Sequence, residues 1–223
     1  MTMNLRTPIA LLVLAAATAA QATTVIYQSD VALQPTNVHT FVDLQQFDPS
    51  LGTLQSVSVT LSGEIASRIR LENKNSTPAT LTATVDATVT LDLPNLGTLS
   101  VAPKVSETFN APSYDSVVDF GGTSGITYPT ATASASVIRD FLLPAQLAPF
   151  IGNGMLHATF DASATASFTG PSNNRTSVRS DAGGFALVTY TYIPSPVPEP
   201  DSWTLMAAGL GLLVWLASRR RIG

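Results

Sequence analysis

The stretch "TLTATVDATVTLDL", residues 80–93, decides the fold of this chain. Apolar side chains occupy every second position, and threonine or aspartate fills the positions between them. The apolar set is Leu81, Ala83, Val85, Ala87, Val89, Leu91 and Leu93. Strict alternation places the two sets on opposite faces of an extended strand. The stretch therefore predicts a long β-strand with one buried face.

The same alternation recurs along the chain. It is found in "SVSVTLSG" (56–63), "EIASRIRLEN" (64–73), "MLHATFDASATASF" (155–168) and "GGFALVTYTYI" (183–193). Gly63 is expected to mark a bulge or bend. Clusters of Pro, Gly and Asn separate these runs and predict turns. The pattern predicts an all-β fold, an antiparallel β-sandwich of the jelly-roll or Greek-key-like kind, with a closed barrel as the alternative. Residues Ser136–Gly152 contain two prolines and are expected to form a short helix or an ordered loop.

The first residues, "MTMNLRTPIALLVLAAATAAQA" (1–22), have the pattern of a signal peptide. One cation, Arg6, precedes an apolar run, and the small residues Ala20 and Ala22 stand where a signal peptidase reads the chain. The alternative, a buried N-terminal helix, would show a polar stripe. We expect residues 1–22 to be removed by signal peptidase after transport by the general secretion machinery.

Composition limits the partners of the exported part. The chain contains no cysteine, so the mature protein depends on its core alone. Residues 23–200 hold seven Lys and Arg against fourteen Asp and Glu. Such a surface argues against nucleic acid, whose phosphates require clustered cations, and against adhesion to an anionic membrane by charge.

Few residues suggest chemistry. His39 and His157 are interpreted as surface histidines, because a zinc site would need carboxylates to complete it. Asp115 and Asp119 would lie about 13 Å apart on an extended segment, too far to share a proton. Calcium could be held by loop oxygens, for which the candidates are Asp43, Asp48, Asn73 and Asn75. No D-x-D-x-D loop is present, so we predict no metal site. Since the sequence shows no other set of residues that would act together in catalysis, we also predict no cofactor, no catalytic residue and no enzymatic activity.

The C-terminal residues do not show the alternation of a strand. We expect the ectodomain to cover residues 23–193, a proline-rich linker 194–202, a single transmembrane helix 203–218, and a basic cytoplasmic tail 219–223. The uncharged run 203–217 makes only about 22 Å of helix, shorter than a bilayer core, and a core helix of a soluble domain is the alternative. Arg219, Arg220 and Arg221 place the tail on the cytoplasmic side.

This C-terminus resembles the PEP-CTERM sorting signal. The resemblance rests on Pro198, Glu199 and Pro200, followed by the apolar run and the arginines, and covers residues 197–223. It implies a Gram-negative bacterium that makes extracellular polysaccharide, and a membrane enzyme, an exosortase, that cleaves near the motif. The precursor would be anchored transiently in the inner membrane before the protein reaches the cell surface or matrix.

The ectodomain is similar to the choice-of-anchor type E module. The similarity rests on "FDPSLGTLQSVSVTLSG", "IRLEN", "FIGNG" and "ALVTYTY", over residues 24–193. It implies an exported protein and no catalytic residues. We therefore expect a non-enzymatic surface or matrix protein associated with exopolysaccharide or biofilm. The alternative is a carbohydrate-binding module at the cell surface, with Tyr114, Tyr128, Tyr190 and Tyr192 as stacking surfaces.

Overall fold

The computed structural model describes residues 21–195 and 200–219, which belong to two compact units. One unit, Ala22–Ser195, contains all the strands of the described residues and both hydrophobic clusters. Its strands are β1 (Thr23–Pro35), β2 (Val38–Gln45), β3 (Gly52–Asn73), β4 (Ala79–Leu93), β5 (Gly97–Val101), β6 (Lys104–Ala111), β7 (Gly125–Phe141), β8 (Met155–Thr169) and β9 (Asn174–Pro194). The other unit contains helix α2 (Pro200–Arg219).

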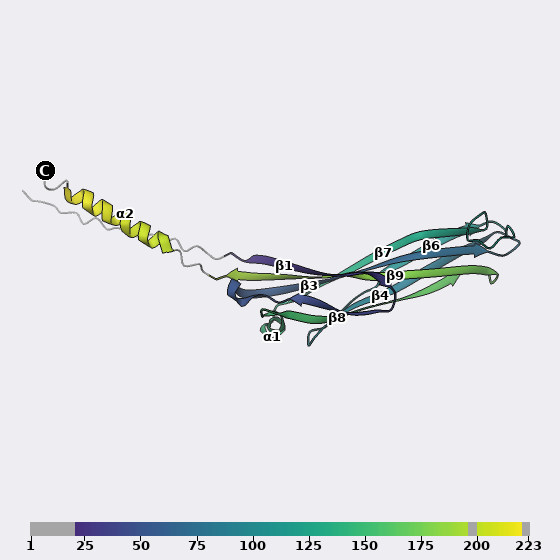
Figure 1. Ribbon diagram of the computed structural model, residues 1–223, viewed down its shortest axis with the longest axis horizontal. Coiled ribbons are helices and arrows are strands. Elements are labelled where there is room, and N and C mark those ends of the chain that lie inside the picture. Colours follow the sequence, from purple (N-terminus) through teal and green to yellow (C-terminus); the bar gives the residue numbers. More distant parts are fainter. Residues whose placement is uncertain (1–20, 196–199, 220–223) are drawn as a thin grey trace, which may run out of the picture. The chain divides into compact units, whose positions relative to one another are not determined.

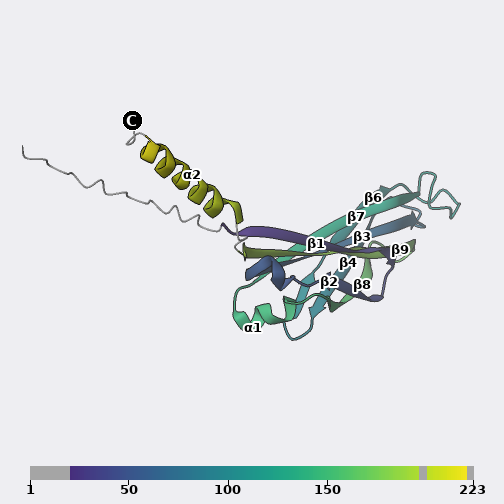
Figure 2. The ribbon, with the colours of Figure 1, turned by 60° about the vertical axis from the view of Figure 1, so that its left-hand side comes forward.

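The strands form two antiparallel sheets that pack as a sandwich (Figures 1 and 2). One sheet has the order β1-β9-β3-β7, and the other has the order β2-β8-β4 with β5 and β6 following each other along the far edge of β4. The structure therefore agrees with the sequence prediction of an antiparallel all-β sandwich, and its strands lie in two sheets rather than in one closed sheet.

The core lies between the sheets, where the alternating apolar residues meet. All seven apolar side chains of residues 80–93 are buried, each with an exposed fraction of 2% or less. Across from them, β3 contributes Val57, Val59, Leu61, Ile65 and Ile69, which are fully buried. Burial of this kind stabilises a fold by about 25 cal/mol for each Å² of apolar surface removed from water. The prediction of a one-sided strand at residues 80–93 is confirmed.

Gly63 does not mark a bulge, so that part of the expectation of a bulge or bend is wrong. Gly63 pairs without interruption with Ala135 of β7 and Gly184 of β9, and the register shifts of β3 lie elsewhere, between Ser67 and Ile69 and between Leu54 and Ser56. A Cβ atom at residue 63 would lie 2.8 Å from the Cβ of Val89 in the opposite sheet. Glycine is needed here because the two sheets approach each other closely.

We expect Gly63→Ala to lower the free energy of unfolding by about 1–3 kcal/mol, because the added methyl group overpacks the core. Urea unfolding of the exported protein measures this change. The matched control is Gly154→Ala, where the nearest atom to the added Cβ is the side-chain oxygen of Gln46 at 3.3 Å. Equal stabilities of the two variants would contradict the explanation by sheet contact.

One end of the sandwich is closed by short helices and aromatic rings. The 3₁₀ helix η1 (Pro49–Leu51) precedes β3, and α1 (Pro144–Leu147) runs into η2 (Ala148–Phe150). The expectation of a short helix or ordered loop within residues 136–152 is therefore correct for its second half, whereas its first residues belong to β7. Phe150 is fully buried, and its ring centroid lies 5.3 Å from that of Phe141.

Candidate functional site

Strands β2 and β8 carry two histidine–aspartate pairs on their outer face. The Nδ1 atom of His39 lies 2.5 Å from Oδ1 of Asp161, and Nδ1 of His157 lies 2.5 Å from Oδ1 of Asp43. The antiparallel register places each histidine directly opposite its aspartate. The histidine side chains are 69% and 70% exposed, so the prediction of surface histidines is confirmed. Surface ion pairs of this kind contribute little to stability.

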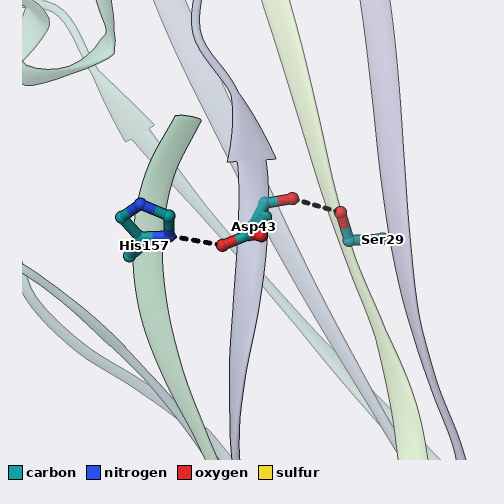
Figure 3. Close-up of polar contacts among 3 residues, drawn as sticks. All are labelled: Ser29, Asp43 and His157. Carbon is teal, nitrogen blue, oxygen red and sulfur yellow. Dashed lines mark hydrogen bonds and ion pairs between the residues drawn. The ribbon is translucent and has the colours of Figure 1, made fainter. Parts of the chain in front are cut away.

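Ser29 completes a serine–aspartate–histidine set without the contacts of a catalytic triad. In Figure 3 the Ser29 hydroxyl lies on the opposite side of Asp43 from His157. It donates a hydrogen bond of 2.5 Å to the main-chain carbonyl of Asp43. A triad requires the serine hydroxyl to contact the histidine that will accept its proton. The bond from Ser29 instead ties edge strand β1 of one sheet to edge strand β2 of the other.

The loop between β6 and β7, residues 112–124, is organised around carboxylates. The Asp115 carboxylate accepts hydrogen bonds from the N–H groups of Val117 and Thr123, and Asp119 accepts one from Gly121. The hydrogen bond from Val117 is the largest cause that lowers the pKa of Asp115 below its usual value. The two aspartates lie in a loop rather than on a strand, and each stabilises its own turn.

Glu72 supports the same loop and was not singled out in the sequence. Its carboxylate is fully buried, and it accepts hydrogen bonds from the Phe120 N–H at 2.7 Å and the Ser124 hydroxyl at 2.5 Å. Phe120 has a positive φ of 58°, which is uncommon for a bulky residue. Arg70 stacks over the Phe120 ring, 4.7 Å from its centroid. In the sequence, Glu72 is marked only by its position at the end of a predicted strand, immediately before the turn residues "NKNSTP" (73–78).

The four calcium candidates are not brought together as one group, although Asn75 donates hydrogen bonds from its main-chain N–H and its side-chain amide to the Asn73 side-chain oxygen. Asp43 pairs with His157, and Asp48 accepts a hydrogen bond from the Ser50 N–H at the start of η1. Asn73 is buried at the far end of β3, where its side chain binds the carbonyls of Thr77 and Pro112. Within residues 21–195 and 200–219, no group of three or more His, Asp or Glu side chains is placed to hold a metal ion.

The tyrosines do not form an exposed row. Tyr190 is fully buried, and its hydroxyl donates a hydrogen bond of 2.6 Å to the Gln45 carbonyl. Tyr192 packs against Phe47, and the hydroxyl of Tyr128 donates to the Thr108 carbonyl. Tyr114 lies in the 112–124 loop, half-buried. The stacking platform that a carbohydrate-binding module would use is therefore absent from these four residues.

Tyr190 makes stability depend on pH above about 10. Burial raises the pKa of the Tyr190 phenol above its ordinary value near 10. Above that pH the unfolded chain has lost the phenol proton while the folded chain keeps it, so the free energy of unfolding falls by up to about 1.4 kcal/mol per pH unit. We expect Tyr190→Phe to remove this contribution, at a cost of about 1 kcal/mol near pH 7 from the lost hydrogen bond. Urea unfolding of both proteins between about pH 8 and pH 11 measures the two slopes, and equal slopes would contradict the prediction.

Three of the residues expected to direct sorting lie among the described residues. Ala22 immediately precedes β1, and Pro200 and Arg219 are the first and last residues of α2. Helix α2 thus begins three residues before the expected start at 203. Ala20, Pro198, Glu199, Arg220 and Arg221 lie outside the described residues.

Helix α2 is apolar and exposed along its described side chains. Residues 206–215 are all exposed, including Leu213 at 65% and Val214 at 69%. The guanidinium of Arg219 lies over the Trp215 ring, 4.1 Å from its centroid. In the part of the chain that the structure covers, none of the helices combines the length and the apolar character needed to cross a membrane. The predicted span at 203–218 is therefore not confirmed.

Comparisons with known proteins bear on the C-terminus rather than on the sandwich. No curated protein matches the chain. Among solved structures, one of turnip yellow mosaic virus is 11% identical, with 86% of this chain and 92% of the viral chain covered and a TM-score of 0.18. The VP2 protein of infectious bursal disease virus is 12% identical, with 78% and 41% covered and a TM-score of 0.12. These likenesses are too weak to support an argument about function.

The last residues match a known motif. Residues 196–221 match the model of the PEP-CTERM protein-sorting motif, which covers the proline-rich segment, the apolar run and the arginines. The chain therefore carries a PEP-CTERM protein-sorting motif, which indicates an exported protein that an exosortase processes.

Proposed function

We propose that the chain is a non-enzymatic surface or extracellular-matrix protein that reaches its destination by exosortase processing and associates there with exopolysaccharide or biofilm. The sorting motif at residues 196–221 is the observation that carries this proposal. In this scheme residues 203–218 hold the precursor in the inner membrane, and cleavage near Pro198–Pro200 releases the sandwich. The ectodomain would be a module of the choice-of-anchor type E kind.

The exposed apolar surface of α2 supports the transient anchor. Its side chains from Met206 to Trp215 are exposed, and several are more than half exposed. A helix that is apolar on all sides is stable in lipid or in a protein interior. Insertion into the inner membrane would cover these side chains, and Arg219 at the end of the helix would mark the cytoplasmic side.

Chain connectivity supports attachment at one end of the sandwich. Thr23, the first residue after the expected signal cleavage, pairs with Tyr192 near the end of β9. The motif residue Pro198 follows Pro194, the end of β9, by four residues, which span about 14 Å at most. Whatever joins the processed C-terminus is thus held close to the Thr23–Tyr192 end. The 112–124 loop lies at the opposite end of β3 (Figure 1).

The carbohydrate-binding alternative is the weaker proposal. It depends on tyrosines that stack on sugar rings, yet Tyr190 is fully buried and Tyr192 packs on Phe47. Association with exopolysaccharide would instead depend on hydroxyl and carboxylate groups of the outer sheet faces.

The C-terminus of the protein tests the proposal. We expect mass spectrometry of the surface or matrix fraction to find a chain that ends near Pro198–Pro200 and lacks Arg219. In cells without the sorting enzyme, the full-length chain should remain in the inner-membrane fraction. Identical C-termini and identical fractionation in both strains would overturn the scheme.

A further inference from the structure

The second half of β8 has one unpaired edge. Strand β2 pairs only with Met155–Ala162, and at the end of this pairing the Asn37 N–H donates to the Ala162 carbonyl at 3.1 Å. Every second residue of a strand directs its N–H and C=O to the same edge. The N–H and C=O groups of Ala164, Ala166 and Phe168 therefore point to the β2 side, where no described strand pairs with them.

The core face of this segment is also uncovered. Phe168 lies opposite Ala83 of β4, and Ala166 lies opposite Val85. Both β4 residues are buried between the sheets, so Phe168 and Ala166 point to the core face as well. Phe168 is nevertheless 45% exposed, and Ala166 is exposed. The sequence continues the apolar alternation here although none of the described residues covers it.

The other edges are protected by charge, by proline or by bonds between the sheets. Their charged residues and prolines are Asp30 and Pro35 in β1, His39 and Asp43 in β2, Pro103, Lys104 and Glu107 along β5 and β6, Pro129, Arg139 and Asp140 in β7, and Arg175 and Arg179 in β9. The uncharged parts of β1 and β7 belong to strands that hydrogen-bond to the opposite sheet. Ser29 of β1 and Tyr128 and Arg139 of β7 each donate to a main-chain carbonyl of that sheet. Residues 163–169, "SATASFT", have none of these devices, which natural edge strands use against pairing.

We propose that residues 163–169 pair antiparallel with the same residues of a second copy of this chain, about a two-fold axis at Ala166. In this register Ala166 faces Ala166 of the second copy, and Ala164 faces Phe168. These are hydrogen-bonded pairs, because their N–H and C=O groups point across the edge. Every free main-chain group of Ala164, Ala166 and Phe168 gains a partner.

The side chains are self-complementary in this register. On the core face the large Phe168 meets the small Ala164, so each ring covers the space beside an alanine. On the outer face Thr165 lies opposite Ser167, and neither carries a charge that would repel its neighbour. The proposed pairing, residues 163–169, matches the length of the unpaired edge. That edge begins after Ala162, whose carbonyl is bound by Asn37, and it ends at Gly170, where the chain turns with a φ of 155°. Isologous contacts of this kind close as dimers.

A single cysteine tests the pairing in the full chain, which has no cysteine of its own. Residues in a hydrogen-bonded antiparallel pair have Cα atoms about 5.5 Å apart, within the range of a disulfide. We expect Ala166→Cys to yield a disulfide-linked dimer on mild oxidation of cells that export the chain. The matched control is Ser134→Cys, an exposed residue of edge strand β7, which should stay monomeric. In this register residue 165 of one copy faces residue 167 of the other, so Thr165→Cys chains should form disulfides with Ser167→Cys chains. Two copies of the same variant should not form them, because their cysteines would lie about 8 Å apart.

Charge variants separate loss of pairing from loss of folding. Sedimentation velocity should show a dimer for the unchanged exported protein and a monomer for the double variant Thr165→Lys, Ser167→Lys. The double variant Thr165→Asp, Ser167→Asp should also be monomeric, and an equimolar mixture of the two should restore a dimer, because lysine then faces aspartate. Recovery in the mixture requires that both variants are folded. The proposal is overturned by a monomeric unchanged protein, by no cross-link at residue 166, by equal cross-linking at residue 134, or by a cross-link to a different protein.

Discussion

Replacement of Pro198, Glu199 and Pro200 with alanine is expected to abolish processing, so that the full-length chain accumulates in the inner-membrane fraction. These residues lie within the part of the chain that matches the sorting motif. A protease binds its substrate as an extended segment, and prolines in a sequence favour that form. Helix α2 itself should form without Pro200, because alanine is a better helix former. The variant therefore removes recognition and keeps the anchor.

The control for this variant lies just outside the matched residues. Pro194→Ala with Ser195→Ala changes the end of β9 and the residue after it, and should leave processing intact. Intact-mass measurement of the chain in each fraction distinguishes the two variants. A further variant, Glu199→Gln, separates the charge of the motif from its shape. Cleavage of the triple-alanine variant at the same bond as the unchanged chain would contradict recognition through this motif.

Local sequence patterns were sufficient where one strand or one linear motif carries the information. The alternation in residues 80–93 predicted β4 and its buried face, because period two is a property of a single strand. The sorting motif was found in the same way, since its parts follow one another along the chain. Neither prediction required knowledge of which strands are neighbours.

Features that depend on strand register could not be predicted. The histidine–aspartate pairs arise because β2 and β8 run antiparallel with His39 opposite Asp161, although these residues are far apart in sequence. Gly63 was taken for a bulge or bend because glycine weakens strands, whereas its role is set by Val89 of the facing sheet. Glu72 is polar and lies near the end of a strand, so no local rule indicates that the 112–124 loop buries it. Such features become visible only when the sheets are assembled.

Phe160→Ala is expected to lower the free energy of unfolding by about 3–5 kcal/mol, a large part of the total of a domain of this size. Phe160 is fully buried on β8, opposite Leu91 of β4 and Thr40 of β2. Its removal leaves a cavity in the core between the sheets. Denaturant unfolding followed by circular dichroism measures the loss, which should not depend on protein concentration.

Phe168→Ala is the matched control, because it changes the same residue type on the same strand and the same face. Phe168 is 45% exposed in one copy of the chain, since β2 does not reach it, so its replacement should cost only about 1 kcal/mol in dilute solution. If a second copy covers Phe168, the cost should grow with protein concentration, as mass action requires. Equal losses for the two variants at every concentration would show that the ring of Phe168 is covered within a single copy. That result would contradict both the pairing register of β8 and the proposed dimer.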